Sequence, residues 1–68
     1  MITVKQDEFE AFIRGIPDDE LTVGRDVGRM HGMACWYKNG KLVAEERWIR
    51  DSTSDPRIFI YKISGAKK

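Results

Sequence analysis

The sequence predicts a small α+β domain in which one short N-terminal helix packs on a three- to four-stranded antiparallel sheet. Three features carry this prediction: an apolar stripe with helical spacing near the N-terminus, an Asn-Gly pair between two apolar segments, and a β-rich run near the C-terminus. The 68 residues are 41% hydrophobic and 34% charged, which is typical of a folded globular chain. We expect a single domain over residues 1–68, with residues 64–68 as a frayed basic tail.

The helix is predicted over residues 8–14. Its core-facing stripe has the spacing i, i+3, i+4 and i+7 and consists of Phe9, Phe12, Ile13 and Ile16. Asp7 and Glu10 have the spacing of a capping box. Gly15 followed by Pro17 predicts the end of the helix, because glycine suits a left-handed C-terminal cap and proline cannot continue the helix.

The stretch between the helix and the Asn-Gly pair is expected to be extended. Glycines recur in it every four residues, at Gly24, Gly28 and Gly32. Each would cost a helix about 1 kcal/mol relative to alanine, whereas in a strand it marks a bulge or a close backbone approach. A helix over residues 24–38 stays open as an alternative, because apolar residues there also have helical spacing. Residues 1–5 are a candidate for a further short strand.

The strongest local signal is Asn39-Gly40, which predicts a type I′ turn and therefore a β-hairpin. If Lys38 lies opposite Lys41, the more apolar side of the hairpin carries Met33, Cys35, Tyr37, Leu42, Ala44 and Trp48, and we assign it to the core. Trp36 then lies on the other face. Residues 57–63 form a further strand with large side chains on both faces, which is typical of a central or covered strand.

No catalytic or metal site is predicted. His31 and Cys35 are four residues apart, and on a strand this spacing separates them by about 13 Å, beyond hydrogen-bond reach. One cysteine and one histidine cannot supply the four ligands of a structural zinc, and a single cysteine forms no intramolecular disulfide. We therefore expect a protein that is not an enzyme and uses no cofactor.

The sequence also indicates a compartment. It has no stretch of about 18 apolar residues, and its first residues lack the pattern of a signal peptide. A lone thiol fits a reducing compartment. We expect a cytoplasmic protein with no membrane partner, and its size suggests an accessory protein of bacteria or their phages.

The first functional hypothesis is a small non-catalytic module for protein interaction or regulation. One short helix covers only one face of a sheet, so large side chains remain uncovered on the other face. The expected interface residues are Trp36, Ile49, Ile58 and Ile60. Because the core has neither a disulfide nor a metal, we also expect a two-fold homodimer through the sheet face or edge that bears Trp36 and the strand over residues 58–63.

The alternative hypothesis is nucleic-acid binding by the sheet. The net charge is only +1, but residues 27–68 carry nine bases against four acids. Basic residues would contact phosphates and aromatic residues would stack on bases. The expected contact residues are Arg29, Trp36, Arg47, Arg50, Arg57, Tyr61 and Lys62. Glu45 and Glu46, which lie in the same hairpin, argue against this hypothesis, so protein interaction is the favoured prediction.

Overall fold

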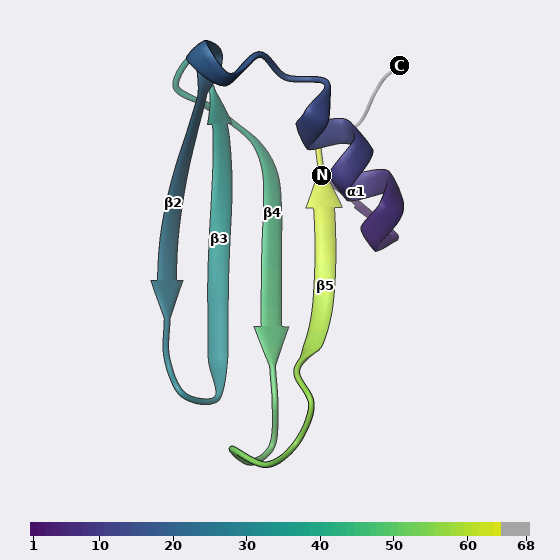
Figure 1. Ribbon diagram of the computed structural model, residues 1–68, viewed down its shortest axis with the longest axis vertical. Helices are drawn as coiled ribbons and strands as arrows, with labels where there is room; N and C mark the ends of the chain where they lie inside the picture. The colour runs from purple at the N-terminus through teal and green to yellow at the C-terminus, as the bar shows by residue number, and fades with distance from the viewer. Residues whose placement is uncertain (65–68) are drawn as a thin grey trace.

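A computed structural model describes residues 1–64 and shows one helix on a five-stranded antiparallel sheet (Figure 1). The elements along the chain are β1 (Ile2–Val4), α1 (Gln6–Arg14), a 3-10 turn (Asp18–Glu20), β2 (Leu21–Val27), β3 (His31–Lys38), β4 (Lys41–Ile49) and β5 (Ile58–Ile63). The strand order is β1-β5-β4-β3-β2. The predicted α+β class is confirmed, with five strands rather than three or four. Of the predicted tail, residues 65–68 lie outside the described residues.

The helix α1 begins two residues earlier than predicted and ends at Arg14 as predicted. The predicted capping box is wrong, and so is the left-handed cap predicted at Gly15, whose φ of −78° is that of a right-handed helix. Lys5 occupies the N-cap position and makes no side-chain capping hydrogen bond. Asp7 therefore lies inside the first turn, where its Oδ1 accepts a hydrogen bond from the backbone N–H of Glu8 at 2.9 Å. A carboxylate in this first turn stabilises the positive end of the helix dipole. Within residues 1–64, no helix has the length and apolar character needed to cross a bilayer.

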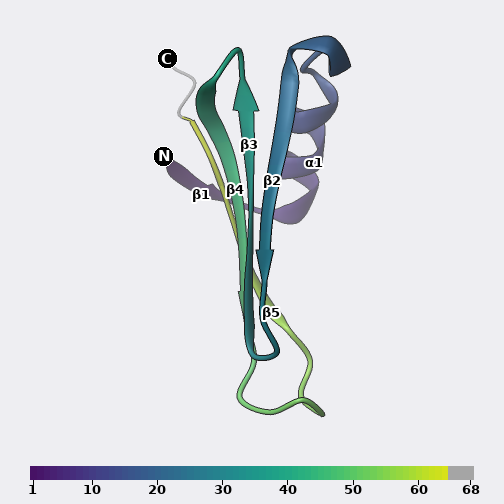
Figure 2. The ribbon, with the colours of Figure 1, turned by 90° about the vertical axis from the view of Figure 1, so that its left-hand side faces the viewer.

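The core lies between α1 and one face of the sheet. Of the predicted helix stripe, Phe9 and Ile16 are buried, and Phe12 and Ile13 are half-buried. The Phe9 ring packs edge-on against Trp36, with ring centroids 5.1 Å apart, and lies 4.9 Å from the ring of Tyr61. Ala34 and Ala44 complete the buried cluster. Figure 2 shows that the helix lies on one side of the sheet only.

A β-bulge at Val43 decides which side chains face the helix. The two residue pairs nearest the turn form as predicted, but Trp36 then pairs with Ala44, so Val43 is an extra residue in β4. A shift of one residue moves every later side chain to the opposite face. The prediction that Trp36 lies on the face away from the core is therefore wrong, and this side chain is 9% exposed.

The same bulge corrects most of the predicted core face of the hairpin. Ala44 and Trp48 lie on the helix side and are 0% and 6% exposed, as expected of core residues. The other four residues assigned to the core lie on the face away from α1, namely Met33, Cys35, Tyr37 and Leu42.

The backbone of the central region matches the extended interpretation, and the helical alternative for residues 24–38 is wrong. Asn39 and Gly40 both have positive φ, 52° and 82°, which confirms the predicted type I′ turn. Gly32 marks the close approach that a glycine in a strand predicts. A Cβ atom at this position would lie 2.3 Å from Nε1 of Trp48.

Candidate binding face

The sheet face opposite α1, called here the open face, is the candidate functional surface. Residues that lie directly opposite each other in antiparallel strands share a face, so the strand registers define its members. Within residues 1–64, no helix or loop lies over this side of the sheet (Figure 2). Its apolar side chains are Met33, Cys35, Tyr37, Leu42, Ile49, Ile58 and Ile60.

Three of the four predicted interface residues come together on the open face. Ile49 lies opposite Ile58, and these side chains are 55% and 61% exposed. Ile60, 43% exposed, lies on the same face of β5 two residues further on. We call these three residues the isoleucine patch. Together with Arg47 and Trp48 they line a hollow of about 190 Å³. Trp36, the fourth predicted residue, packs beneath α1 and does not belong to this surface.

Charged side chains border the isoleucine patch. The Nε of Arg47 donates to Oε2 of Glu45 at 2.7 Å. The Glu45 side chain is only 13% exposed, whereas the Arg47 side chain is 58% exposed. Lys62 lies opposite Glu45 on β5. The buried part of this small network is therefore the carboxylate, and the accessible part is basic.

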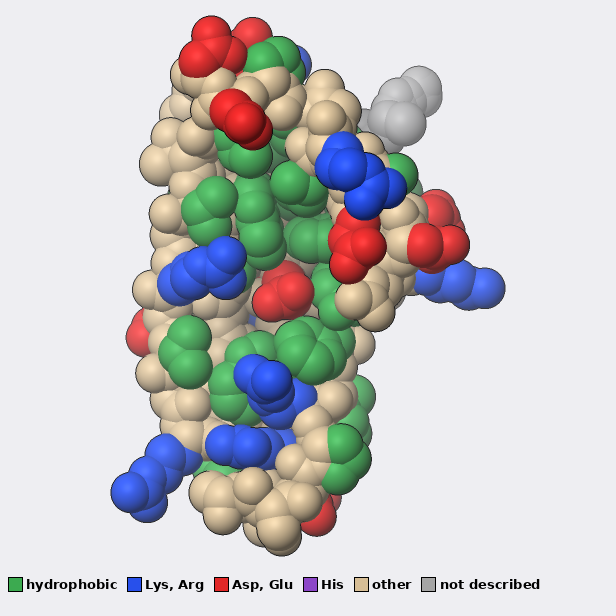
Figure 3. All heavy atoms as spheres, in the orientation of Figure 1, with side chains coloured by type: hydrophobic (Ala, Val, Ile, Leu, Met, Phe, Trp, Pro, Cys, Tyr) green, Lys and Arg blue, Asp and Glu red, His purple; other side chains and the backbone are tan. Residues whose placement is uncertain are grey.

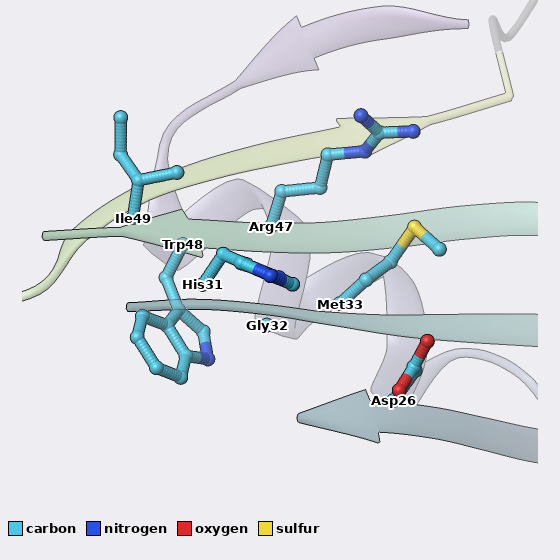
Figure 4. A pocket seen from close by; sticks show the side chains of 7 residues that line it. All are labelled: Asp26, His31, Gly32, Met33, Arg47, Trp48 and Ile49. Carbon is cyan, nitrogen blue, oxygen red and sulfur yellow. The ribbon is translucent and has the colours of Figure 1, made fainter. Parts of the chain in front are cut away.

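A second hollow, of about 340 Å³, lies at the end of the sheet far from α1 (Figure 4). It is lined by Asp26, His31, Gly32, Met33, Arg47, Trp48 and Ile49. Asp26 of β2 brings a carboxylate to the hollow, His31 of β3 an imidazole, and Arg47 of β4 a guanidinium. Within residues 1–64, Asp26 and His31 form no side-chain hydrogen bond or ion pair with each other. The lining of this hollow therefore combines acidic and basic side chains.

The predicted separation of His31 and Cys35 agrees with the structure, because both lie on β3 and are four residues apart. Within the described part of the chain, no cluster of three or more His, Cys, Asp or Glu side chains is arranged to hold a metal ion.

The seven residues predicted to contact nucleic acid are divided between the two faces. Trp36 and Tyr61 pack against Phe9 under the helix. Arg47 and Lys62 belong to the open face. Arg50 and Arg57 lie over Trp48 at the far end of the helix side, and Arg29 lies in the turn between β2 and β3, where its backbone carbonyl contacts Arg50. The structure therefore does not form one surface from the predicted set.

Beyond the helix, Lys and Arg side chains lie over this side of the sheet (Figure 3). Two arginines lie over the buried Trp48 ring. The guanidinium carbons of Arg50 and Arg57 lie 5.5 Å and 5.2 Å from the centre of the Trp48 ring. Arg50 is held in place because its Nε donates to the backbone carbonyl of Arg29 at 2.7 Å. Arg57 also lies 5.5 Å from the ring of Phe59, so two aromatic rings position one guanidinium.

The surroundings of Tyr61 shift its pKa. Burial beneath α1 raises the pKa of Tyr61 above its ordinary value of 10.0, because burial disfavours the charged phenolate. The carboxylates of Glu46 and Glu10 act in the same direction, since like charges repel. Tyr61 is therefore a neutral core residue at physiological pH.

Sequence reasoning missed four side chains of the open face, Met33, Cys35, Tyr37 and Leu42, because it assigned them to the core. The only signal that would have placed them is the bulge, and the residues around Val43 carry no glycine or proline that marks one. No family model, curated protein or solved structure matches this chain.

Proposed function

We propose that this protein is a small non-catalytic interaction module whose open face binds an apolar surface of another protein. The observation that carries the proposal is the isoleucine patch. Three large aliphatic side chains are 43–61% exposed on a sheet face that nothing within residues 1–64 covers. Contiguous exposed apolar surface of this kind marks interaction sites in folded proteins.

The partner chemistry follows from what surrounds the patch. An aliphatic or aromatic side chain of the partner fits the hollow among the three isoleucines. An acidic group beside it pairs with Arg47, whose guanidinium is accessible at the rim. Complete burial of a fully exposed isoleucine is worth about 1.5–3 kcal/mol. Because the patch residues are 43–61% exposed, each can contribute about 0.7–1.8 kcal/mol, which changes affinity about three- to twentyfold.

Photo-crosslinking from the patch tests the proposal. A photo-reactive residue at position 60 should give one discrete adduct in cells of the source organism. Excess wild-type protein should compete this adduct away, and so should Ile2→Lys, which changes a 50% exposed isoleucine on the helix side. Ile58→Lys should fail to compete. Equal competition by all three proteins, or an equally strong adduct from position 8 on the helix, would count against the open face.

Single-stranded nucleic acid is the second candidate ligand, at a different place. The observation in its favour is that Arg50 and Arg57 lie over Trp48 at the far end of the helix side, where Arg57 also contacts Phe59, a residue that is 37% exposed. Exposed aromatic rings beside arginines suit base stacking with phosphate contacts. Salt-dependent binding, described in the Discussion, tests this candidate.

A further inference from the structure

The strand β2 is an outer strand whose outer side pairs with no other strand of the described chain (Figure 1). It is seven residues long, and all seven pair with β3 on the inner side without a register shift. It contains no proline and no bulge, the two features that most directly prevent an edge strand from pairing with another chain. A long regular edge of this kind is a template for another strand.

The hydrogen bonds at both ends of β2 show which backbone groups point outward. The N–H of Gly28 donates to the carbonyl of His31 at 2.8 Å, and the N–H of Asn39 donates to the carbonyl of Glu20 at 3.1 Å. Hydrogen-bonded and non-hydrogen-bonded pairs alternate along an antiparallel ladder. The even-numbered residues of β2 therefore bond to β3, and the odd-numbered residues direct their N–H and C=O groups to the outer edge. These are Leu21, Val23, Arg25 and Val27.

We propose that β2 pairs antiparallel with β2 of a second copy of this chain, with the two Gly24 residues facing each other on a two-fold axis. In this register, Val23 lies opposite Arg25 of the other copy and Leu21 lies opposite Val27. All four outward residues of each copy then form hydrogen-bonded pairs, which gives eight backbone hydrogen bonds. This proposal concerns the sheet edge and is independent of the proposed role of the open face.

Charge selects this register over its neighbours. A two-fold axis at Arg25 would place two arginines directly opposite each other, and an axis at Asp26 would do the same with two aspartates. An axis at Val23 would place Glu20 opposite Asp26. Like charges directly opposite each other are destabilising. With the axis at Gly24, Asp26 faces the Thr22 hydroxyl, which donates to a carboxylate.

The same axis brings opposite charges together beyond the ends of the strand. Continuing the register places Asp19, in the acidic 3-10 turn before β2, beside Arg29 in the turn after β2 of the other copy. Asp18 is next to it in the acidic turn. All three side chains are exposed, and none forms an ion pair within residues 1–64. By symmetry, the complementary contact occurs twice in the dimer.

Pairing along β2 also enlarges the open face. A two-fold axis perpendicular to the sheet keeps both open faces on the same side of a continuous ten-stranded sheet. Four strands at about 4.8 Å spacing and seven residues at about 3.3 Å give one copy a face of roughly 450 Å². Two copies together present roughly 900 Å², close to the area that one partner contributes to a standard protein interface.

Charge reversal tests the proposal by sedimentation at micromolar concentrations. Wild-type protein should sediment as a dimer of twice 7.9 kDa. Two variants reverse the charge on one side of the proposed contact: Arg29→Glu, and the double variant Asp18→Arg with Asp19→Arg. Each variant should weaken dimerisation tenfold or more, because it places like charges beside each other at both ends of the paired strands. An equimolar mixture of the two variants should form a mixed dimer. Lys5→Glu, a charge reversal far from β2, is the matched control and should dimerise like wild type.

Amide hydrogen exchange gives a second readout that does not depend on variants. In the dimer, the backbone amides of Leu21, Val23, Arg25 and Val27 should be protected, and dilution should expose these four first. A wild-type protein that stays monomeric at all micromolar concentrations overturns the proposal, as does a dimer that both reversals leave intact. Ile58→Lys should leave the dimer intact, so failure at the open face remains distinguishable from failure at the edge.

Discussion

Replacing Gly32 by alanine places a methyl group where the Trp48 indole already lies. The new Cβ would be 2.3 Å from Nε1, 2.5 Å from Cε2 and 2.9 Å from Cζ2 of Trp48. Ordinary van der Waals contact begins at 3.4 Å, so the nearest ring atom must retreat by 3.4 − 2.3 = 1.1 Å. The ring is 6% exposed and lies under Arg50 and Arg57, so a retreat of the ring disturbs its contacts with these two guanidinium groups.

The magnitude follows from the two contacts that the displacement disturbs. Overpacking a core position costs about 1–3 kcal/mol. Each cation–π contact that is lost with the ring position adds about 0.5–1 kcal/mol. We therefore expect Gly32→Ala to lower the free energy of unfolding by about 2–5 kcal/mol. For a domain of this size, the corresponding fall in Tm is at least about 8 °C.

Denaturant unfolding followed by tryptophan fluorescence measures this effect, and Gly24→Ala is the matched control. Gly24 lies in the neighbouring strand, and a Cβ there has nothing within 4 Å. Its replacement should be neutral or stabilising by up to about 1 kcal/mol, because alanine restricts the unfolded chain. In a Trp48→Leu background, the cost of Gly32→Ala should largely disappear. Equal stability of the two alanine variants would refute the packing of Trp48 on Gly32.

Three further predictions test other parts of the structure. Phe9→Ala should destabilise the protein by about 3–5 kcal/mol, and Phe59→Ala should destabilise it clearly less, because Phe9 is 4% exposed and Phe59 is 37% exposed. Thermal melts that rank the two variants in the opposite order would contradict the assignment of Phe9 to the core. The raised pKa of Tyr61 contributes stability that is fully present below pH 10 and should be lost as the pH rises through the folded-state pKa, because the unfolded chain releases the proton first. Tyr61→Phe should remove that part of the alkaline loss of stability. An alkaline profile that Tyr61→Phe leaves unchanged would show that Tyr61 is not buried as described. If the arginines near Phe59 bind single-stranded nucleic acid, a plot of log affinity against log salt concentration should have a slope of about −0.7 per neutralised phosphate. Arg57→Ala should make this slope less steep. If fluorescence anisotropy detects no binding at low salt, nucleic acid is removed as a candidate ligand.

The sequence contained enough local information to predict the helix and the hairpin turn. The helix stripe around Phe9 has a spacing that only a helix places on one side. Asn39 and Gly40 tolerate the positive φ angles that the turn requires. Both signals are confined to a few adjacent residues, so the helix and the turn could be predicted without knowledge of the rest of the fold.

The faces of the hairpin could not be predicted, because one inserted residue determines them. The bulge at Val43 lies in a Lys-Leu-Val-Ala segment that is equally compatible with a regular strand. Its position is set by tertiary packing, since it brings Ala44 to the same face as Trp36, which packs against Phe9 under the helix. In a regular register Ala44 would lie opposite Cys35, on the face away from Trp36, so joint burial beneath α1 outweighed regular pairing.

The candidate site was predicted in part for a related reason. Ile49, Ile58 and Ile60 lie beyond the bulge in strands whose mutual register is regular, so they stayed together on the open face. Trp36 lies on β3 next to the bulge and moved to the core. The length of the exposed edge formed by β2 was also hidden, because glycines at positions 24 and 28 left the boundaries of that strand undefined.

Solvent exposure of the isoleucine methyl groups in the purified protein tests most directly whether one side of the sheet is available for binding. A soluble paramagnetic agent speeds methyl relaxation in proportion to exposure. We predict strong enhancement at Ile49, Ile58 and Ile60, comparable with that of Ile2, which is 50% exposed, and weak enhancement at Ile16, which is 9% exposed. If the three patch residues instead relax as slowly as Ile16, the open face is already covered and cannot serve as the binding surface.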